Sequence, residues 1–88
     1  MRKIIYTDPF LDQMTQVTSN RVRGAIFDAI DKLIVVPVIG STNLPQAIID
    51  KYGDEVRKLV VKPFLVIYKV LPDENLLILG LMYGRAAY

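Results

Sequence analysis

The side chains that could do chemistry in this sequence are basic residues and tyrosines in its C-terminal half. From Val56 to Pro72 the chain carries basic residues and no acid. The basic residues are Arg57, Lys58, Lys62 and Lys69. Beyond them, Tyr83 and Tyr88 flank Arg85, whereas several acids, among them Asp54 and Glu55, precede the stretch. One face of the folded protein is therefore expected to be basic.

Many kinds of catalytic site are excluded by what the sequence lacks. It contains no cysteine and no histidine, which removes disulfides, thiol nucleophiles, Cys/His zinc sites and histidine general bases. It has no phosphate-binding glycine loop, no paired carboxylates and no cluster of metal ligands. We therefore expect no cofactor and no metal. The net charge is only +2, so overall charge would not hold the protein on DNA or RNA.

Length and composition predict one folded domain over residues 1–88. Hydrophobic residues make up 52% of the chain and charged residues 23%, a globular composition. The apolar share is high for so short a chain, which favours an apolar surface that meets a partner. The N-terminal apolar run is too short for a signal peptide, and no run approaches the roughly 20 residues of a membrane span. We expect a cytoplasmic protein.

The first half of the chain predicts a strand followed by a helical hairpin. Residues 3–7 are rich in Ile and Tyr and predict a strand. Asp8 is the expected N-cap of a short helix with Pro9 at its first position. Ser19 or Asn20 can cap a second helix, in which apolar residues recur at helical spacing. Its apolar positions are Val22, Ile26, Ala29, Ile30, Leu33 and Ile34. This helix must end before Pro37.

The second half predicts three consecutive strands. A loop at residues 40–43 precedes a short helix at 44–52, with Gly53 as its left-handed terminating residue. The strands expected from their β-branched and aromatic residues are 56–61, 64–71 and 76–83. The turn at 72–75 makes the last two an antiparallel hairpin, with Asn75 suited to a left-handed conformation.

The last two strands are apolar on both faces, so each face of the sheet needs a cover. The helices can cover one face. The other could be covered by residues 44–52 and the C-terminal tail, by a partner chain, or by a second copy in a homodimer. The sequence leaves these alternatives open.

The order of elements and the C-terminal third resemble the RelE/ParE toxin superfamily. In that family a strand with an arginine, here Arg57, leads to a strand of the form aromatic-x-x-x-Tyr-basic-Val. Phe64, Tyr68, Lys69 and Val70 match that strand. The family's last strand ends in an aromatic or His, Gly and Arg, which matches residues 83–85. The resemblance implies an α+β fold: an N-terminal strand, an α-helical hairpin and a three-stranded antiparallel meander, in one sheet packed on the helices.

The resemblance also implies a function. Members are growth-inhibiting toxins of bacterial type II toxin–antitoxin systems (addiction modules that include plasmid-stabilization systems), each neutralised by a cognate antitoxin that wraps its apolar and basic surface. RelE-type toxins cleave mRNA on the ribosome, whereas ParE-type toxins inhibit DNA gyrase. Leu65 stands where RelE-type nucleases carry an arginine, and residues 62–64 and 83–85 look closer to ParE-like members. A protein target such as gyrase is therefore expected, with ribosome-dependent mRNA cleavage or a non-toxic interaction domain as the alternatives.

Candidate site residues follow from this resemblance and from the chemistry of RNA cleavage. RNA cleavage without histidine needs cations that stabilise charge on phosphate and a group that takes the 2′-hydroxyl proton. The catalytic candidates for such an enzyme are Arg57, Lys62, Arg85 and Tyr88. The candidates for binding a target or antitoxin are Arg57, Lys62, Leu65, Lys69, Tyr83, Arg85 and Tyr88. Competing structural roles are an ion pair of Arg57 with Asp54 or Asp50, protection of a sheet edge by the lysines, and core packing by Tyr68.

Overall fold

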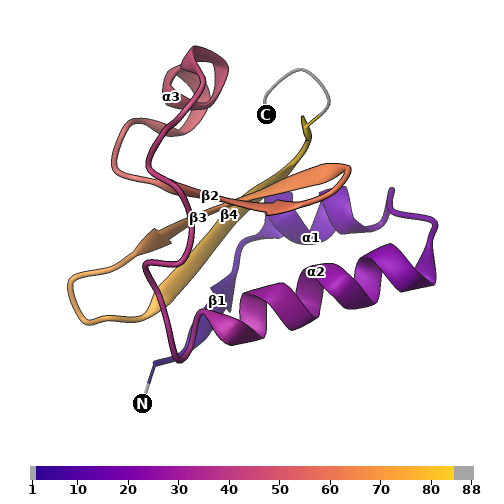
Figure 1. The fold of residues 1–88 in the computed structure, drawn as a ribbon, viewed down its shortest axis with the longest axis horizontal. Helices are drawn as coiled ribbons and strands as arrows, with labels where there is room; N and C mark the ends of the chain where they lie inside the picture. Colours follow the sequence, from indigo (N-terminus) through magenta and orange to yellow (C-terminus); the bar gives the residue numbers. More distant parts are fainter. Residues whose placement is uncertain (1, 85–88) are drawn as a thin grey trace.

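A four-stranded sheet forms the centre of the fold in the computed structural model, which describes residues 2–84 (Figure 1). The strands are β1 (Ile4–Tyr6), β2 (Arg57–Val61), β3 (Phe64–Val70) and β4 (Leu76–Tyr83). Their order across the sheet is β1-β4-β3-β2. Strand β1 runs parallel to β4, and β3 is antiparallel to both of its neighbours. The predicted meander is confirmed, and the N-terminal strand joins its sheet.

The hairpin between β3 and β4 turns on a different residue from the one predicted. The residue with positive φ is Glu74, at 69°, not Asn75. Asn75 is instead the first residue of the returning chain: its carbonyl accepts from the Leu71 N–H at 2.8 Å. Its own N–H donates to the Asp73 carboxylate at 3.0 Å. The left-handed position of this turn is therefore occupied by Glu74, and Asn75 closes the hairpin.

Two helices cover one face of the sheet: α1 (Asp8–Met14) and α2 (Asn20–Lys32) (Figure 1). The predicted cap of α1 is wrong by one residue, since Thr7 is the N-cap and Asp8 is already helical. The Thr7 hydroxyl makes no cap bond and donates to the Ile78 carbonyl on β4 at 2.7 Å. The Ser19 hydroxyl does cap α2, accepting from the Val22 N–H at 3.3 Å. The Thr7 side chain therefore binds β4 instead of capping the first turn of α1.

The larger core lies between these helices and the sheet. Tyr6, Phe10 and Phe27 come from β1, α1 and α2, and their rings meet with centroids 5.6–6.4 Å apart. The buried residues of this core are Phe10, Met14, Val17, Ile26, Ile30, Leu33, Val66, Tyr68, Leu76, Ile78 and Leu81. The apolar positions spaced along the helices and those that alternate along the strands are therefore buried together in one core.

The opposite face of the sheet is covered in part by α3 (Gln46–Tyr52). Ile48 of α3 is fully buried against Val56, Leu65 and Ile67. Residues 44–52 therefore supply part of the missing cover, as one of the alternatives predicted, and Gly53 ends the helix with φ 85°. Figure 1 shows α3 across the sheet from α1 and α2. No helix within residues 2–84 is long and apolar enough to cross a membrane.

Candidate functional site

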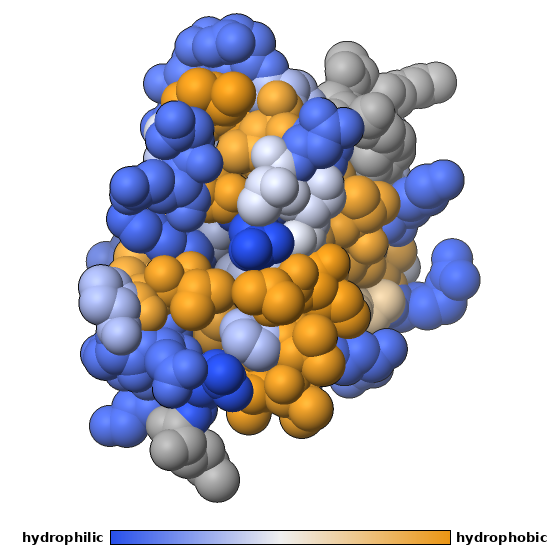
Figure 2. Space-filling model, turned by 60° about the vertical axis from the view of Figure 1, so that its left-hand side comes forward, coloured by the Kyte–Doolittle hydropathy of each residue, from blue (hydrophilic) through white to orange (hydrophobic). Residues whose placement is uncertain are grey.

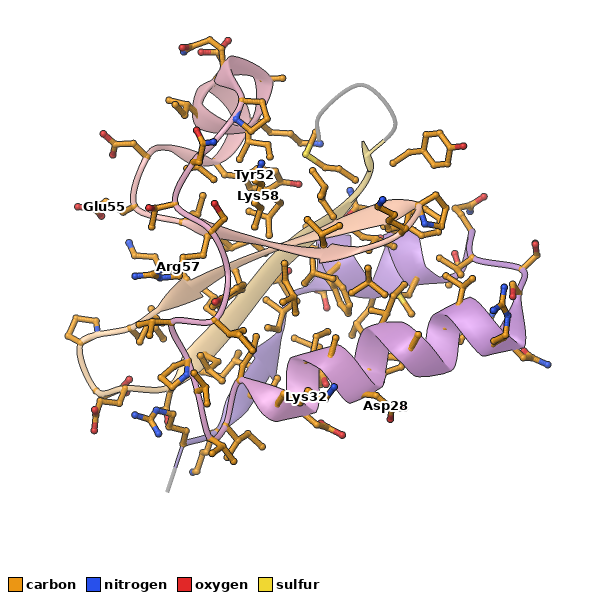
Figure 3. All side chains as sticks on the ribbon, viewed as in Figure 1. Asp28, Lys32, Tyr52, Glu55, Arg57 and Lys58 are labelled. Atoms are coloured by element: carbon orange, nitrogen blue, oxygen red, sulfur yellow. The ribbon has the colours of Figure 1, made fainter. Side chains whose placement is uncertain are left out.

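Arg57 lies on the helix-covered face of the sheet and binds the chain's own backbone. It pairs with the buried Tyr68 across β2 and β3. Its guanidinium donates to the carbonyl oxygens of Val38 at 3.3 Å and Gly40 at 2.9 Å. The ion pairs predicted for it with Asp50 or Asp54 are wrong: within residues 2–84 it makes no salt bridge. Arg57 therefore holds the segment that connects α2 to α3, beside which Figure 3 shows it.

Tyr68 holds the same segment from inside the core. Its hydroxyl donates to the Pro37 carbonyl at 2.8 Å and accepts from the Gly40 N–H at 2.9 Å. Burial raises the pKa of Tyr68 above 10.0, while the Gly40 hydrogen bond and the nearby Arg57 charge act in the opposite direction. A Cβ on residue 40 would lie 2.6 Å from the Tyr68 hydroxyl oxygen, so glycine is needed there. The predicted core role of Tyr68 is confirmed, and its hydroxyl also binds the backbone of the segment between α2 and α3.

Lys69 lies on the opposite face, in the wall of a hollow of about 300 Å³. Its ammonium group pairs with the Glu55 carboxylate at 3.2 Å. The hollow is lined by Tyr52, Gly53, Asp54, Glu55, Val56, Lys69, Leu77 and Leu79. Next to it on β1, Ile5 faces the same side and is 40% exposed. This is the part of the face that α3 leaves open, and its mixed apolar and charged lining suits the binding of a polypeptide side chain.

The other predicted residues lie at the far end of the sheet or in the core. Lys62 is exposed in the turn between β2 and β3. Tyr83 is 59% exposed and meets the Phe64 ring edge to face, 5.8 Å between centroids. Leu65 is fully buried under α3, so the binding role predicted for it finds no accessible surface in this structure. Arg85 and Tyr88 lie outside the described residues.

The predicted site residues therefore do not form one cluster. Neighbouring strand positions point to opposite faces, so Arg57, opposite Tyr68, and Lys69 lie on different sides of the sheet. Within residues 2–84, no three His, Cys, Asp or Glu side chains gather where they could hold a metal ion. The arrangement resolves into two separate surfaces, one beside Arg57 and one around Lys69.

Sequence reasoning missed Tyr52 and its relation to Gly80. Tyr52 of α3 lies against β4 so closely that a Cβ on Gly80 would be 2.1 Å from the Tyr52 hydroxyl oxygen. An isolated glycine inside an apolar strand is typical of a position where another group approaches the backbone. Gly80 is therefore the sequence feature from which a close approach to β4, here by Tyr52, could have been predicted.

The fold can be compared with known structures. A chain in the crystal structure of the intact E. coli RelBE toxin-antitoxin complex superposes with a TM-score of 0.68. The match covers 93% of this chain and 95% of that chain at 10% sequence identity. The protein therefore has a RelE-like α+β fold. No family model matches the sequence, and no curated protein matches it. At this identity the likeness shows the fold alone.

Proposed function

We propose that this chain is the toxin of a bacterial toxin–antitoxin pair, that it acts in the cytoplasm and that a cognate antitoxin neutralises it. The observation that carries the proposal is the RelE-like fold, shared over 93% of the chain with a chain of a toxin–antitoxin complex. The family-like positions in β2, β3 and β4 support it further, because they fall on the strands where the resemblance puts them.

We further propose a protein target, of which DNA gyrase is the leading candidate, rather than mRNA. A nuclease needs several donors around one phosphate to stabilise the charge of the transition state. Among residues 2–84, Arg57 and Lys69 lie on opposite faces of the sheet, and Lys69 is paired with Glu55. Leu65, where RelE-type nucleases carry an arginine, is buried. These observations favour binding over RNA cleavage.

The test is inducible expression in bacteria with three readouts from the same cultures: growth, plasmid supercoiling with gyrase-linked DNA breaks, and mRNA integrity. The wild type is compared with Arg85→Ala and with a matched control, Arg21→Ala, which removes an exposed arginine from the start of α2. We expect the wild type and the control to arrest growth with damaged DNA and intact mRNA, and Arg85→Ala to be less toxic.

Other outcomes would redirect or refute the proposal. Codon-spaced mRNA cuts on translating ribosomes would replace the gyrase target with the ribonuclease alternative. Harmless expression of the folded wild-type protein would refute a toxin and leave a non-toxic interaction domain. Co-expression of a small neighbouring gene that relieves the arrest would identify the antitoxin.

A further inference from the structure

The segment between α2 and α3 presents an exposed apolar surface. Four large apolar side chains fall within residues 35–39, and their exposed fractions are 80% for Val35, 44% for Val36, 59% for Val38 and 51% for Ile39. We call these four residues the 35–39 surface. Figure 2 brings this side of the molecule forward and shows a band of apolar atoms bordered by hydrophilic ones. Apolar groups gathered on a connecting segment are unusual, and such patches mark interaction sites.

The backbone beneath this surface is held by hydrogen bonds. The Val36 N–H donates to the Lys32 carbonyl at 3.0 Å, and the Ile39 N–H donates to the Val36 carbonyl at 3.2 Å. The next two residues are tied to the sheet, Gly40 by the Tyr68 hydroxyl and Ser41 by a pair of backbone bonds to Lys58. A surface that is already ordered loses little conformational entropy when a partner binds.

The border of the 35–39 surface is cationic. Arg57 binds the Val38 carbonyl at 3.3 Å and has no carboxylate within ion-pair distance among residues 2–84. Arg2 binds the Ile34 carbonyl at 3.0 Å and pairs with an exposed Glu74 carboxylate at 3.5 Å. The guanidinium of Arg57 is thus the charge at this border that a partner carboxylate can complement.

This charge argues against a second copy as the occupant. In a two-fold dimer the same patch meets itself, so two such surfaces would bring like-charged guanidinium groups together, and the Glu74 carboxylate at this border is already paired with Arg2. A segment that combines apolar side chains with an acidic residue satisfies both features of the surface.

We propose that the 35–39 surface is the docking site for an apolar and acidic segment of a partner protein, whose carboxylate binds Arg57. The inference rests on the proposed function in that a neutralising antitoxin is the partner expected to supply the segment. It is tested on the purified chain without a growth assay, so its failure and the failure of the proposed function are distinguishable.

The experiment uses random peptides displayed on phage and selected on the immobilised full-length chain. An enriched peptide is then synthesised, labelled and titrated by fluorescence anisotropy against the wild type, Val35→Asp/Val38→Asp and Arg57→Gln. Leu11→Asp is the matched control, because Leu11 is an apolar side chain on α1 with a comparable exposure of 43%. Thermal melts verify that each variant is folded.

We expect the selected peptides to combine apolar and acidic residues. The double variant should bind at least about tenfold more weakly, since it replaces two apolar contacts with charges of the peptide's own sign. Arg57→Gln should weaken binding about tenfold and remove most of its salt dependence. Leu11→Asp should bind like the wild type.

Three results would overturn the proposal. Peptides without acidic residues would remove the role of Arg57. Unchanged binding to a folded double variant would place the site elsewhere. A wild-type dimer in sedimentation experiments that dissociates in the double variant would show that the occupant is a second copy.

Discussion

The sharpest test of the tertiary arrangement is the substitution Tyr68→Phe. It deletes only the hydroxyl that joins β3 to the segment between α2 and α3. Phenylalanine keeps the ring that fills the larger core, so no large cavity forms. What is lost is one bond donated to the Pro37 carbonyl at 2.8 Å and one accepted from the Gly40 N–H at 2.9 Å.

The expected loss in the free energy of unfolding is about 2–3 kcal/mol. Each of the two hydrogen bonds contributes about 0.5–1.5 kcal/mol net. Gly40 is buried, so its N–H would stay without a partner and out of water, which places the cost near the upper end of that range. A domain of this size has about 5–15 kcal/mol of stability in all, so the variant should fold but melt earlier.

Urea denaturation followed by circular dichroism measures the effect. With a slope of about 1–3 kcal/mol per molar urea, the midpoint should fall by about 0.7–3 M. Amide hydrogen exchange should show faster exchange at Gly40. The matched control is Tyr83→Phe, because the Tyr83 side chain is 59% exposed and its ring packs edge to face against Phe64 at the end of the sheet. A Tyr68→Phe midpoint equal to that of the control would refute the reasoning.

Three further predictions concern pH, packing and charge. Because burial raises the pKa of Tyr68, the folded protein keeps that proton at pH values where the unfolded chain loses it, so wild-type stability should be fully present below about pH 10 and decline above it; urea midpoints measured across that range should fall less steeply in Tyr68→Phe. Gly80→Ala should cost about 1–3 kcal/mol because the new methyl group would meet the Tyr52 hydroxyl, and calorimetry should find a smaller cost on a Tyr52→Ala background if that contact is the cause. Lys69→Ala should change stability by less than about 1 kcal/mol, since its ion pair with Glu55 is largely exposed; a larger drop in melting temperature would contradict this.

The positions of most elements could be predicted from local sequence. The apolar spacing from Val22 to Ile34 led to α2, observed over Asn20–Lys32, because a helix repeats its buried face every 3.6 residues. The β-branched runs led to β2, β3 and β4 within a residue at each end. Gly53 was correctly assigned to the end of α3, where a positive φ favours glycine.

The cap of α1 and the left-handed residue of the last turn were predicted less well than the elements. The Thr7 hydroxyl binds β4, 71 residues further along the chain, instead of capping α1. The left-handed residue of the last turn is Glu74, while the Asn75 carbonyl accepts the Leu71 N–H that closes the hairpin. The Thr7 bond is long-range and has no local sequence pattern, whereas the Leu71–Asn75 bond lies within the turn itself.

The sequence by itself determined the element order and the residue types available for chemistry, because propensity and periodicity act over neighbouring positions. The RelE-like fold class was expected from the resemblance of the element order and the C-terminal third to a known family. Only the tertiary structure decided which face Arg57, Lys69 and Leu65 occupy. Arg57 donates hydrogen bonds to backbone carbonyls beside an exposed apolar segment. Lys69 lies on the opposite face of the sheet, and Leu65 is buried. The physical reason is strand alternation combined with pairing: once Arg57 aligns with Tyr68, the faces of their neighbours are determined.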